Sequence, residues 1–170
     1  VVVNDYGQPG RDGTGEASTG PAEEVAAEIR GAGGRAVAHT GDVADFQQAR
    51  ELVELAVTEF GKLDILVNNA GILRDRMVFS MTEGEWDSVI RVHLKGHFNT
   101  THFAAAHWRE RSKAAGAPVY GRIGHTSSEA VLAGSAGGAH HTGAARGGGR
   151  RAHPHPPPPP HPGRSPTAPS

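Results

Sequence analysis

The sequence predicts an α/β fold in which helices cover a parallel β-sheet. Three observations support this prediction: short apolar runs of strand length alternate with amphipathic stretches of helical period, capping patterns open those stretches, and glycines close them. Such alternation is typical of parallel sheets with helices on both faces. At 170 residues the chain has room for one domain with a sizeable core.

Four segments are predicted as strands. Each is a short, largely apolar run bounded by polar or glycine-containing stretches, which is the pattern of strands buried in a parallel sheet. They are Val1–Asn4, Arg35–His39, Leu63–Val67 and Val119–Thr126.

Three helices are predicted between these strands. The first begins near Pro21, where proline suits a first helical turn, and the second follows a capping-box pattern of Asp45 with Gln48. The third opens with a second capping box, Thr82 with Glu85, and is expected to extend to Trp108. The apolar period assigns these inward-facing side chains: Ala22, Val25, Ala26 and Ile29; then Phe46, Ala49, Val53, Ala56 and Phe60; then Trp86, Val89, Ile90, Leu94, Phe98 and Thr101.

The composition changes sharply along the chain. All 18 acidic side chains and 13 of the 17 Lys and Arg lie in residues 1–129, and nine of the last 17 residues are proline. Proline lacks a backbone donor and fixes φ, so a segment so rich in it forms neither helix nor sheet. We therefore expect a folded unit over residues 1–139 and a disordered Gly/His/Pro-rich tail over residues 140–170.

The overall composition excludes several classes of protein. The net charge of −1 gives no reason to expect nucleic acid or an anionic membrane as a partner. No apolar run approaches the length of a membrane span, no signal peptide is recognisable, and there is no cysteine for disulfides or thiolate chemistry. These features together predict a cytoplasmic protein.

Polar residues follow the predicted strands at their carboxyl ends. Asp5 ends the first strand, the pair Asp42-Val43 follows the second, Asn68-Asn69 ends the third and Ser127-Ser128 ends the fourth. In parallel sheets, ligands bind at this edge. A carboxylate placed as Asp5 is can accept hydrogen bonds from an adenosine ribose and repel a 2′-phosphate, although the same residue can equally cap a turn.

Several motifs resemble the short-chain dehydrogenase/reductase superfamily. The motifs are VVVNDYG at residues 1–7, EVAAEIRGAGGRAVA at 24–38, NNAGILRDR at 68–76 and RVHLKG at 91–96. Together they are most similar to the (3R)-hydroxyacyl-CoA dehydrogenase part of peroxisomal multifunctional enzyme type 2 and its bacterial relatives. The resemblance covers residues 1–139 and implies a doubly wound, Rossmann-like sheet that binds NAD(H) or NADP(H), in an enzyme that forms a homodimer or homotetramer.

The resemblance also implies roles for individual residues. Asp5 matches the acidic residue that selects NAD over NADP, and Asp42 with Val43 matches the pair beside the adenine. The segment Asn69, Ala70 and Gly71 matches the one that contacts the cofactor ribose, and Ser128 matches the serine that holds the substrate oxygen. His93 stands where the superfamily usually has a proton-relaying asparagine, as it does in the multifunctional-enzyme branch; the alternative is an ordinary core histidine.

The family's catalytic tyrosine and lysine are absent. The expected positions hold His141 and Ala145 or, with one inserted residue, Thr142 and Arg146. Threonine is too weak an acid to replace a phenol, and arginine does not release its proton. His141 can in principle shuttle a proton, but nothing replaces the lysine. We therefore expect that the chain as given is not catalytically competent.

Both ends of the chain differ from the family pattern. No Gly-rich phosphate loop precedes Asp5, so we expect an N-terminal truncation that removes the first strand, which lies between the strands ending at Asp5 and Asn68. Its loss leaves two strand pairs with open edges. We interpret the tail after Gly137 as an out-of-frame translation of GC-rich coding sequence. Reading the other two frames for a Tyr-x-x-x-Lys pattern tests this interpretation.

Three functions remain open at this point. The first is an NAD-dependent oxidoreductase acting on a 3-hydroxyacyl thioester, and the second is a 3-oxoacyl-(acyl-carrier-protein) reductase that uses NADPH. The third is a non-catalytic chain whose Pro/His-rich tail binds a proline-recognition domain or a transition metal. The tail histidines lack the spacing and the accompanying carboxylates of a convincing metal site, so no metal ligand is assigned.

Overall fold

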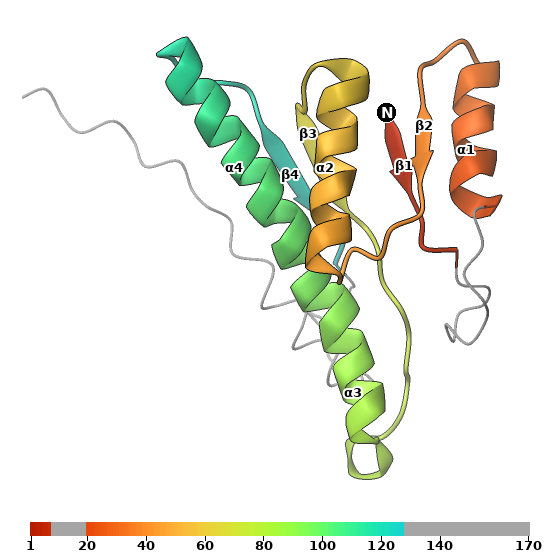
Figure 1. Cartoon of the computed structure of the whole chain (residues 1–170). Helices are drawn as coiled ribbons and strands as arrows, with labels where there is room; N and C mark the ends of the chain where they lie inside the picture. Colours follow the sequence, from red (N-terminus) through yellow and green to blue (C-terminus); the bar gives the residue numbers. More distant parts are fainter. Residues whose placement is uncertain (8–19, 128–170) are drawn as a thin grey trace, which may run out of the picture.

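The computed structural model describes residues 1–7 and 20–127 and has the predicted alternation of strands and helices (Figure 1). The strands are β1 (Val2–Asn4), β2 (Val37–His39), β3 (Ile65–Asn68) and β4 (Arg122–His125). The helices are α1 (Gly20–Gly31), α2 (Phe46–Phe60), α3 (Glu83–Ile90) and α4 (His97–Ala115), with a 3₁₀ turn at Val78–Ser80 and a π-turn at Arg91–Gly96. The predicted tail, residues 140–170, lies outside the described residues.

The described strands form two parallel pairs. β1 pairs with β2, Val2 opposite Val37, and β3 pairs with β4, Ile65 opposite Arg122. Figure 1 shows α2 between the two pairs, where it contacts both β1 and α4. The parallel pairing and the division into two pairs are both confirmed, and the fold is the Rossmann-like α/β arrangement that the sequence predicts.

The helix boundaries follow the local capping signals. The Thr82 side chain accepts a hydrogen bond from the Glu85 backbone N–H, and the Glu85 carboxylate accepts from the Thr82 backbone N–H, so this capping box is confirmed. Asp45 likewise caps α2 through the Gln48 backbone N–H, at 2.9 Å. However, the Gln48 side chain accepts from the backbone of Asp42 instead of Asp45, so the reciprocal half of that predicted box is wrong.

The core is built from small side chains. α1 packs through Ala22 and Ala26, and α2 through Ala49, Val53 and Ala56, all of which are buried. In these two helices, two predicted core residues are instead exposed, Val25 at 44% and Phe46 at 47%.

The face that α4 buries differs from the predicted face. Phe98, predicted to point inward, is 59% exposed, while His97, Asn99, Thr100 and Ala104 are buried. The buried positions 96, 100 and 104 continue the helical spacing from Val89, so the apolar side chains Leu94 and Phe98 simply lie on a neighbouring, more exposed face of the helix. Val89, which precedes the π-turn, is fully buried as predicted. Trp86 and Leu94 lie 40% and 36% exposed, at the edge of the contact.

Strand β3 alternates between two environments. Leu66 and Asn68 are buried toward α4, whereas Ile65 and Val67 are 56% and 65% exposed on the opposite face. Within the described residues, this pair of strands is therefore covered on one face only. Among the same residues, no helix combines the length and the apolar character needed to cross a bilayer.

Candidate cofactor-binding site

The carboxyl end of β3 is anchored by a buried amide. Asn68 is 4% exposed, and its Oδ1 accepts a hydrogen bond from the Thr100 hydroxyl at 2.7 Å. Its Nδ2 lies 3.2 Å from the Thr101 hydroxyl and 3.3 Å from His125 Nδ1. One side chain thus joins β3 to both α4 and β4. Sequence analysis placed Asn68 at this edge without assigning it a role; no sequence signal names its partners, which lie 32 to 57 residues away.

The residues that follow Asn68 are exposed and held from the side of β4. The Thr126 backbone N–H donates to the Asn68 carbonyl at 2.9 Å, and the Thr126 hydroxyl donates to Asn69 Oδ1 at 2.8 Å. Asn69, Ala70 and Gly71 are all exposed at the sheet edge. Thr126 therefore holds the start of this segment from the β4 side, while Asn69, Ala70 and Gly71 stay open to the outside.

His93, in the π-turn before α4, contacts the backbone just after the Asn69–Gly71 segment. Its Nε2 lies 3.0 Å from the backbone nitrogen of Ile72 and 2.9 Å from the carbonyl oxygen of the same residue. A single ring nitrogen serves only one of these groups at a time, so the tautomer decides which bond forms. This contact also needs the glycine before Ile72, because a Cβ on Gly71 would lie 2.5 Å from His93 Cε1. The half-buried ring thus supports the loop, and nothing further of its role follows from these contacts.

His97 lies beneath the same loop and is 8% exposed. Its Nε2 is buried and has no hydrogen-bond partner among the described residues. Its ring centroid is 5.2 Å from that of His125, at the end of β4. Burial, with the adjacent His125 and His93, lowers the pKa of His97 to about 4, and a hydrogen bond to the Ala70 backbone only partly opposes this. The imidazole is therefore neutral at physiological pH. His97 was not predicted to be buried, because the apolar pattern favoured the helical face that carries Phe98.

The loop Asp42–Ala44 is anchored to the same kinked helix. Asp42 Oδ1 accepts from the Ala44 backbone N–H at 2.8 Å, and Asp42 Oδ2 pairs with Arg91 at 2.5 Å. Asn99 Nδ2 donates to the Val43 carbonyl at 3.0 Å. A Cβ on Gly96 would lie 2.9 Å from the Val43 side chain, so glycine permits the close approach.

Asp5 lies at the end of β1, one strand away from this loop. Its backbone N–H donates to the His39 carbonyl at 3.1 Å, which continues the β1–β2 ladder. Its Oδ1 accepts from the Gly7 backbone N–H at 2.7 Å, and Gly7 adopts φ +72°. This is an Asx turn, so one of the two carboxylate oxygens of Asp5 caps a turn, which is the alternative role considered for this residue. The side chain remains exposed at the sheet edge.

The structure thus places all six predicted cofactor residues beyond the carboxyl ends of strands. Asp5, Asp42, Val43 and the segment Asn69–Gly71 all follow strand ends of the two parallel pairs. The remaining predicted site residues, Ser128, His141, Thr142 and Arg146, lie outside the described residues. Among those that are described, no group of three or more His, Asp or Glu side chains is arranged to hold a metal ion.

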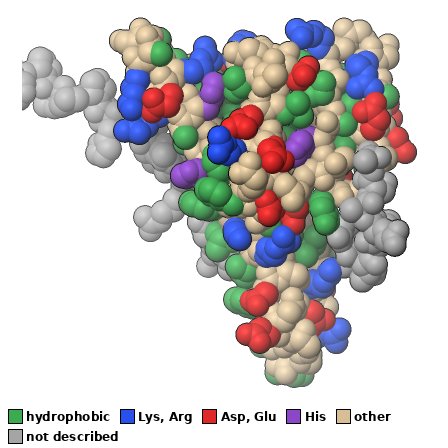
Figure 2. All heavy atoms as spheres, in the orientation of Figure 1, with side chains coloured by type: hydrophobic (Ala, Val, Ile, Leu, Met, Phe, Trp, Pro, Cys, Tyr) green, Lys and Arg blue, Asp and Glu red, His purple; other side chains and the backbone are tan. Residues whose placement is uncertain are grey.

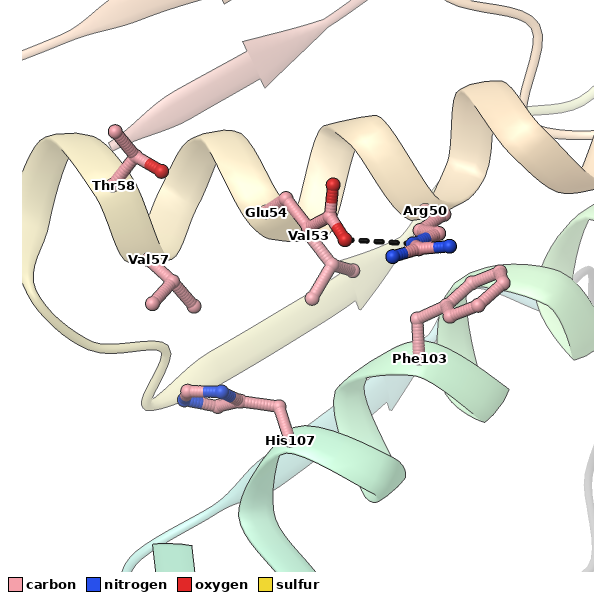
Figure 3. Close-up of a pocket in the computed structure, with 7 residues that line it drawn as sticks. All are labelled: Arg50, Val53, Glu54, Val57, Thr58, Phe103 and His107. Carbon is pink, nitrogen blue, oxygen red and sulfur yellow. Dashed lines mark hydrogen bonds and ion pairs between the residues drawn. The ribbon is translucent and has the colours of Figure 1, made fainter. Parts of the chain in front are cut away.

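A separate groove of about 390 Å³ lies between α2 and α4 (Figure 3). Val53, Val57 and Phe103 form its apolar lining, and the ion pair of Arg50 with Glu54 lies at its rim. None of the predicted site residues lines it.

Figure 2 shows acidic and basic side chains interspersed over this face of the molecule, without a patch of one sign. We assign the groove no role in cofactor binding.

Comparison with known proteins agrees with this description. The short chain dehydrogenase family model matches residues 15–150. A hydroxyacyl-CoA dehydrogenase, ChsB1, of Mycobacterium tuberculosis is 51% identical over 126 residues, which cover 74% of this chain and 39% of the relative. Peroxisomal multifunctional enzyme type 2 of Mus musculus is 40% identical over 144 residues, covering 85% of this chain and 18% of the relative.

Among solved structures, a short chain dehydrogenase from Mycobacterium avium superposes with a TM-score of 0.76 at 50% sequence identity. The match covers 86% of this chain and 50% of that one. The fold and the positions of the strand-end residues are those of a Rossmann-like α/β protein. The chain belongs to the short-chain dehydrogenase/reductase family, as its motifs predict, and it spans half or less of the length of these relatives.

Proposed function

We propose that the chain binds NAD at the carboxyl edge of its strands and belongs to an oxidoreductase that acts on a 3-hydroxyacyl thioester. The observation that carries the proposal is the anchoring of Asn69–Gly71. Asn68, Thr126 and His93 hold this segment from three elements while its outer side stays exposed. Family membership supports a nicotinamide cofactor, and the hydroxyacyl-CoA dehydrogenase name of one relative supports the substrate class.

Each half of the dinucleotide has its own residues in this proposal. Asp5 accepts hydrogen bonds from the adenosine ribose and repels a 2′-phosphate, which favours NAD over NADP. Asp42 and Val43 lie beside the adenine, and Asn69–Gly71 contact the ribose on the nicotinamide side. When bound, the nicotinamide supplies the hydride acceptor.

The reacting oxygen of the substrate is assigned to Ser128, which orients it by a hydrogen bond. His93 is assigned to the proton relay that leads away from the site. The step that the chain lacks is proton exchange with the alcohol, because neither His141 with Ala145 nor Thr142 with Arg146 reproduces a phenol beside an ammonium group. We therefore propose cofactor binding without appreciable turnover for the chain as given.

Calorimetric titration of the 170-residue chain with NADH and with NADPH tests the cofactor assignment. We expect NADH to bind at least about tenfold more tightly, since an unfavourable charge pair of about 1.4 kcal/mol gives that ratio. The Asp5→Asn variant keeps an oxygen for the Gly7 turn but loses the charge, so its preference for NADH should shrink. Equal affinity for both cofactors in the unmodified chain would remove Asp5 from the proposal.

Restoring the missing pair tests the catalytic assignment. The double variants His141→Tyr with Ala145→Lys, and Thr142→Tyr with Arg146→Lys, represent the two possible registers. A gain of NAD-dependent oxidation of a 3-hydroxyacyl-CoA by one of them, absent from the unmodified chain, would show that the pair supplies the missing step. Activity with NADPH and a 3-oxoacyl carrier protein instead would favour the reductase alternative. Full activity of the unmodified chain would contradict the requirement for the pair.

The proposal includes a cytoplasmic location and a homodimeric or homotetrameric intact enzyme. Several relatives are named peroxisomal, so the location is best tested by imaging a fluorescent fusion. Sedimentation of the intact enzyme tests the assembly, and a monomer would contradict it.

A further inference from the structure

We infer that Arg91 is a positioning residue for the adenine end of the cofactor, acting through Asp42. The inference rests on the proposed function, in which Asp42 lies beside the adenine. Nothing in the sequence pairs these two residues, which are 49 positions apart. The structure joins them at the point where the kinked helix α3–α4 meets the loop after β2.

The two oxygens of the Asp42 carboxylate have different partners. Oδ1 accepts from the Ala44 backbone N–H at 2.8 Å, and Oδ2 accepts from Arg91 Nη2 at 2.5 Å. Because one donor acts on each oxygen, the plane of the carboxylate is fixed. A carboxylate offers about four acceptor positions, so these two bonds leave acceptor capacity for an adenine amino group.

The exposure of the pair suits this role. The Asp42 side chain is 13% exposed, whereas Arg91 is 52% exposed. The carboxylate is therefore largely buried, and a buried charge without a partner is costly. The more exposed guanidinium of Arg91 supplies that partner. A surface arginine whose partner is itself exposed, such as Arg50 with Glu54, has no such effect on a buried group.

Arg91 also begins the π-turn that supports the other end of the site. The same turn carries His93, which contacts the Ile72 backbone, and Gly96, which contacts Val43. A π-turn inside an α-helix is frequently found at functional sites. Here one turn contacts the loops proposed for both halves of the dinucleotide. Within the described residues, Arg91 is the side chain of this turn that forms an ion pair with the Asp42–Ala44 loop.

The two halves of the cofactor can be titrated separately to test this role. AMP probes the adenine end and nicotinamide mononucleotide probes the other. In calorimetric titrations of the full chain, we expect Arg91→Gln to weaken AMP binding about three- to tenfold and to leave nicotinamide mononucleotide unchanged. Arg91→Lys, which keeps the charge without the planar donors, should recover part of the loss. Arg50→Gln is the matched control and should change neither affinity.

A double-variant cycle shows whether Arg91 acts through Asp42. If it does, Asp42→Asn combined with Arg91→Gln binds AMP no more weakly than Asp42→Asn alone. Additive losses would mean that Arg91 touches the nucleotide directly, and equal losses for both probes would mean a general structural role; either result overturns the inference. If the unmodified chain binds neither probe, the cofactor proposal itself fails. If it binds both and Arg91→Gln binds as well, only the role of Arg91 fails.

Discussion

The buried His97 makes the chain sensitive to acid in a calculable way. Its pKa is lowered from 6.5 to about 4 in the folded chain, chiefly by burial and then by the positive charges of His125 and His93. In the unfolded chain the imidazole titrates at its ordinary pKa of about 6.5. Between these values the unfolded chain binds a proton that the folded chain does not, so the free energy of unfolding falls as the pH is lowered.

The size of this effect follows from the two pKa values. Each pKa unit corresponds to about 1.4 kcal/mol. Protonation linked to His97 therefore lowers the free energy of unfolding by about 3 kcal/mol as the pH falls from above 6.5 toward 4. Above pH 6.5 the contribution is fully present. Because a small domain has only about 5–15 kcal/mol of stability, this one side chain is expected to account for a large part of its acid sensitivity.

Two measurements check this prediction. Proton NMR titration of the imidazole signals should give His97 a pKa well below 6, and urea unfolding at a series of pH values should show the stability loss. His97→Asn removes the titrating ring, and its unfolding free energy should vary less between pH 7 and pH 4.5. His102→Gln, on the exposed side of the same helix, is the matched control and should keep the original pH dependence. A His97 pKa near 6.5 would contradict this prediction. It would mean either that the ring is exposed to solvent or that the chain is unfolded.

Three further substitutions test the contacts around the site. Asn68→Ala should lower the free energy of unfolding by about 1–3 kcal/mol in urea titrations, because the buried hydrogen bonds that join β3 to α4 and β4 are lost. A loss below about 0.5 kcal/mol would show that the buried amide does not join these elements. Gly71→Ala should lower the free energy of unfolding by about 1–3 kcal/mol and weaken NADH binding, because the added methyl group would overlap His93. Gly84→Ala is the control: its methyl group has no neighbouring atom within 4 Å, so the change should be neutral or stabilising. Asp45→Ala should cost about 1 kcal/mol in thermal unfolding through loss of the α2 cap, and an unchanged midpoint would contradict that role.

Local signals in the sequence predicted the elements and their starts. The capping box of Thr82 with Glu85 was predictable because both partners lie within one turn. The same spacing of Asp45 and Gln48 predicted the cap but not the Gln48 partner, because the backbone of Asp42 folds back within reach of that amide. All four strands were predicted in the right part of the chain, but each predicted range is longer than the observed strand. The ends of a strand depend on pairing partners from distant parts of the chain.

Features set by tertiary contacts were not predictable from the pattern. The apolar pattern predicted Phe98 to point inward, whereas the structure buries the polar His97, Asn99 and Thr100, whose partners lie far away in the sequence. The strand-end residues were found because parallel strands present their carboxyl ends at one edge. The contacts that hold them, such as Arg91 with Asp42 and Thr100 with Asn68, join positions tens of residues apart.

The location of the cofactor is the central claim, and nitrogen-15 NMR of the chain during an NADH titration tests it most directly. We expect the backbone signals of Asp5, of Asp42–Ala44 and of Asn69–Ile72 to shift with a common dissociation constant. Signals of Val53, Val57 and other residues lining the groove between α2 and α4 should stay in place. Shifts confined to that groove, or no shifts at saturating NADH, would contradict the account.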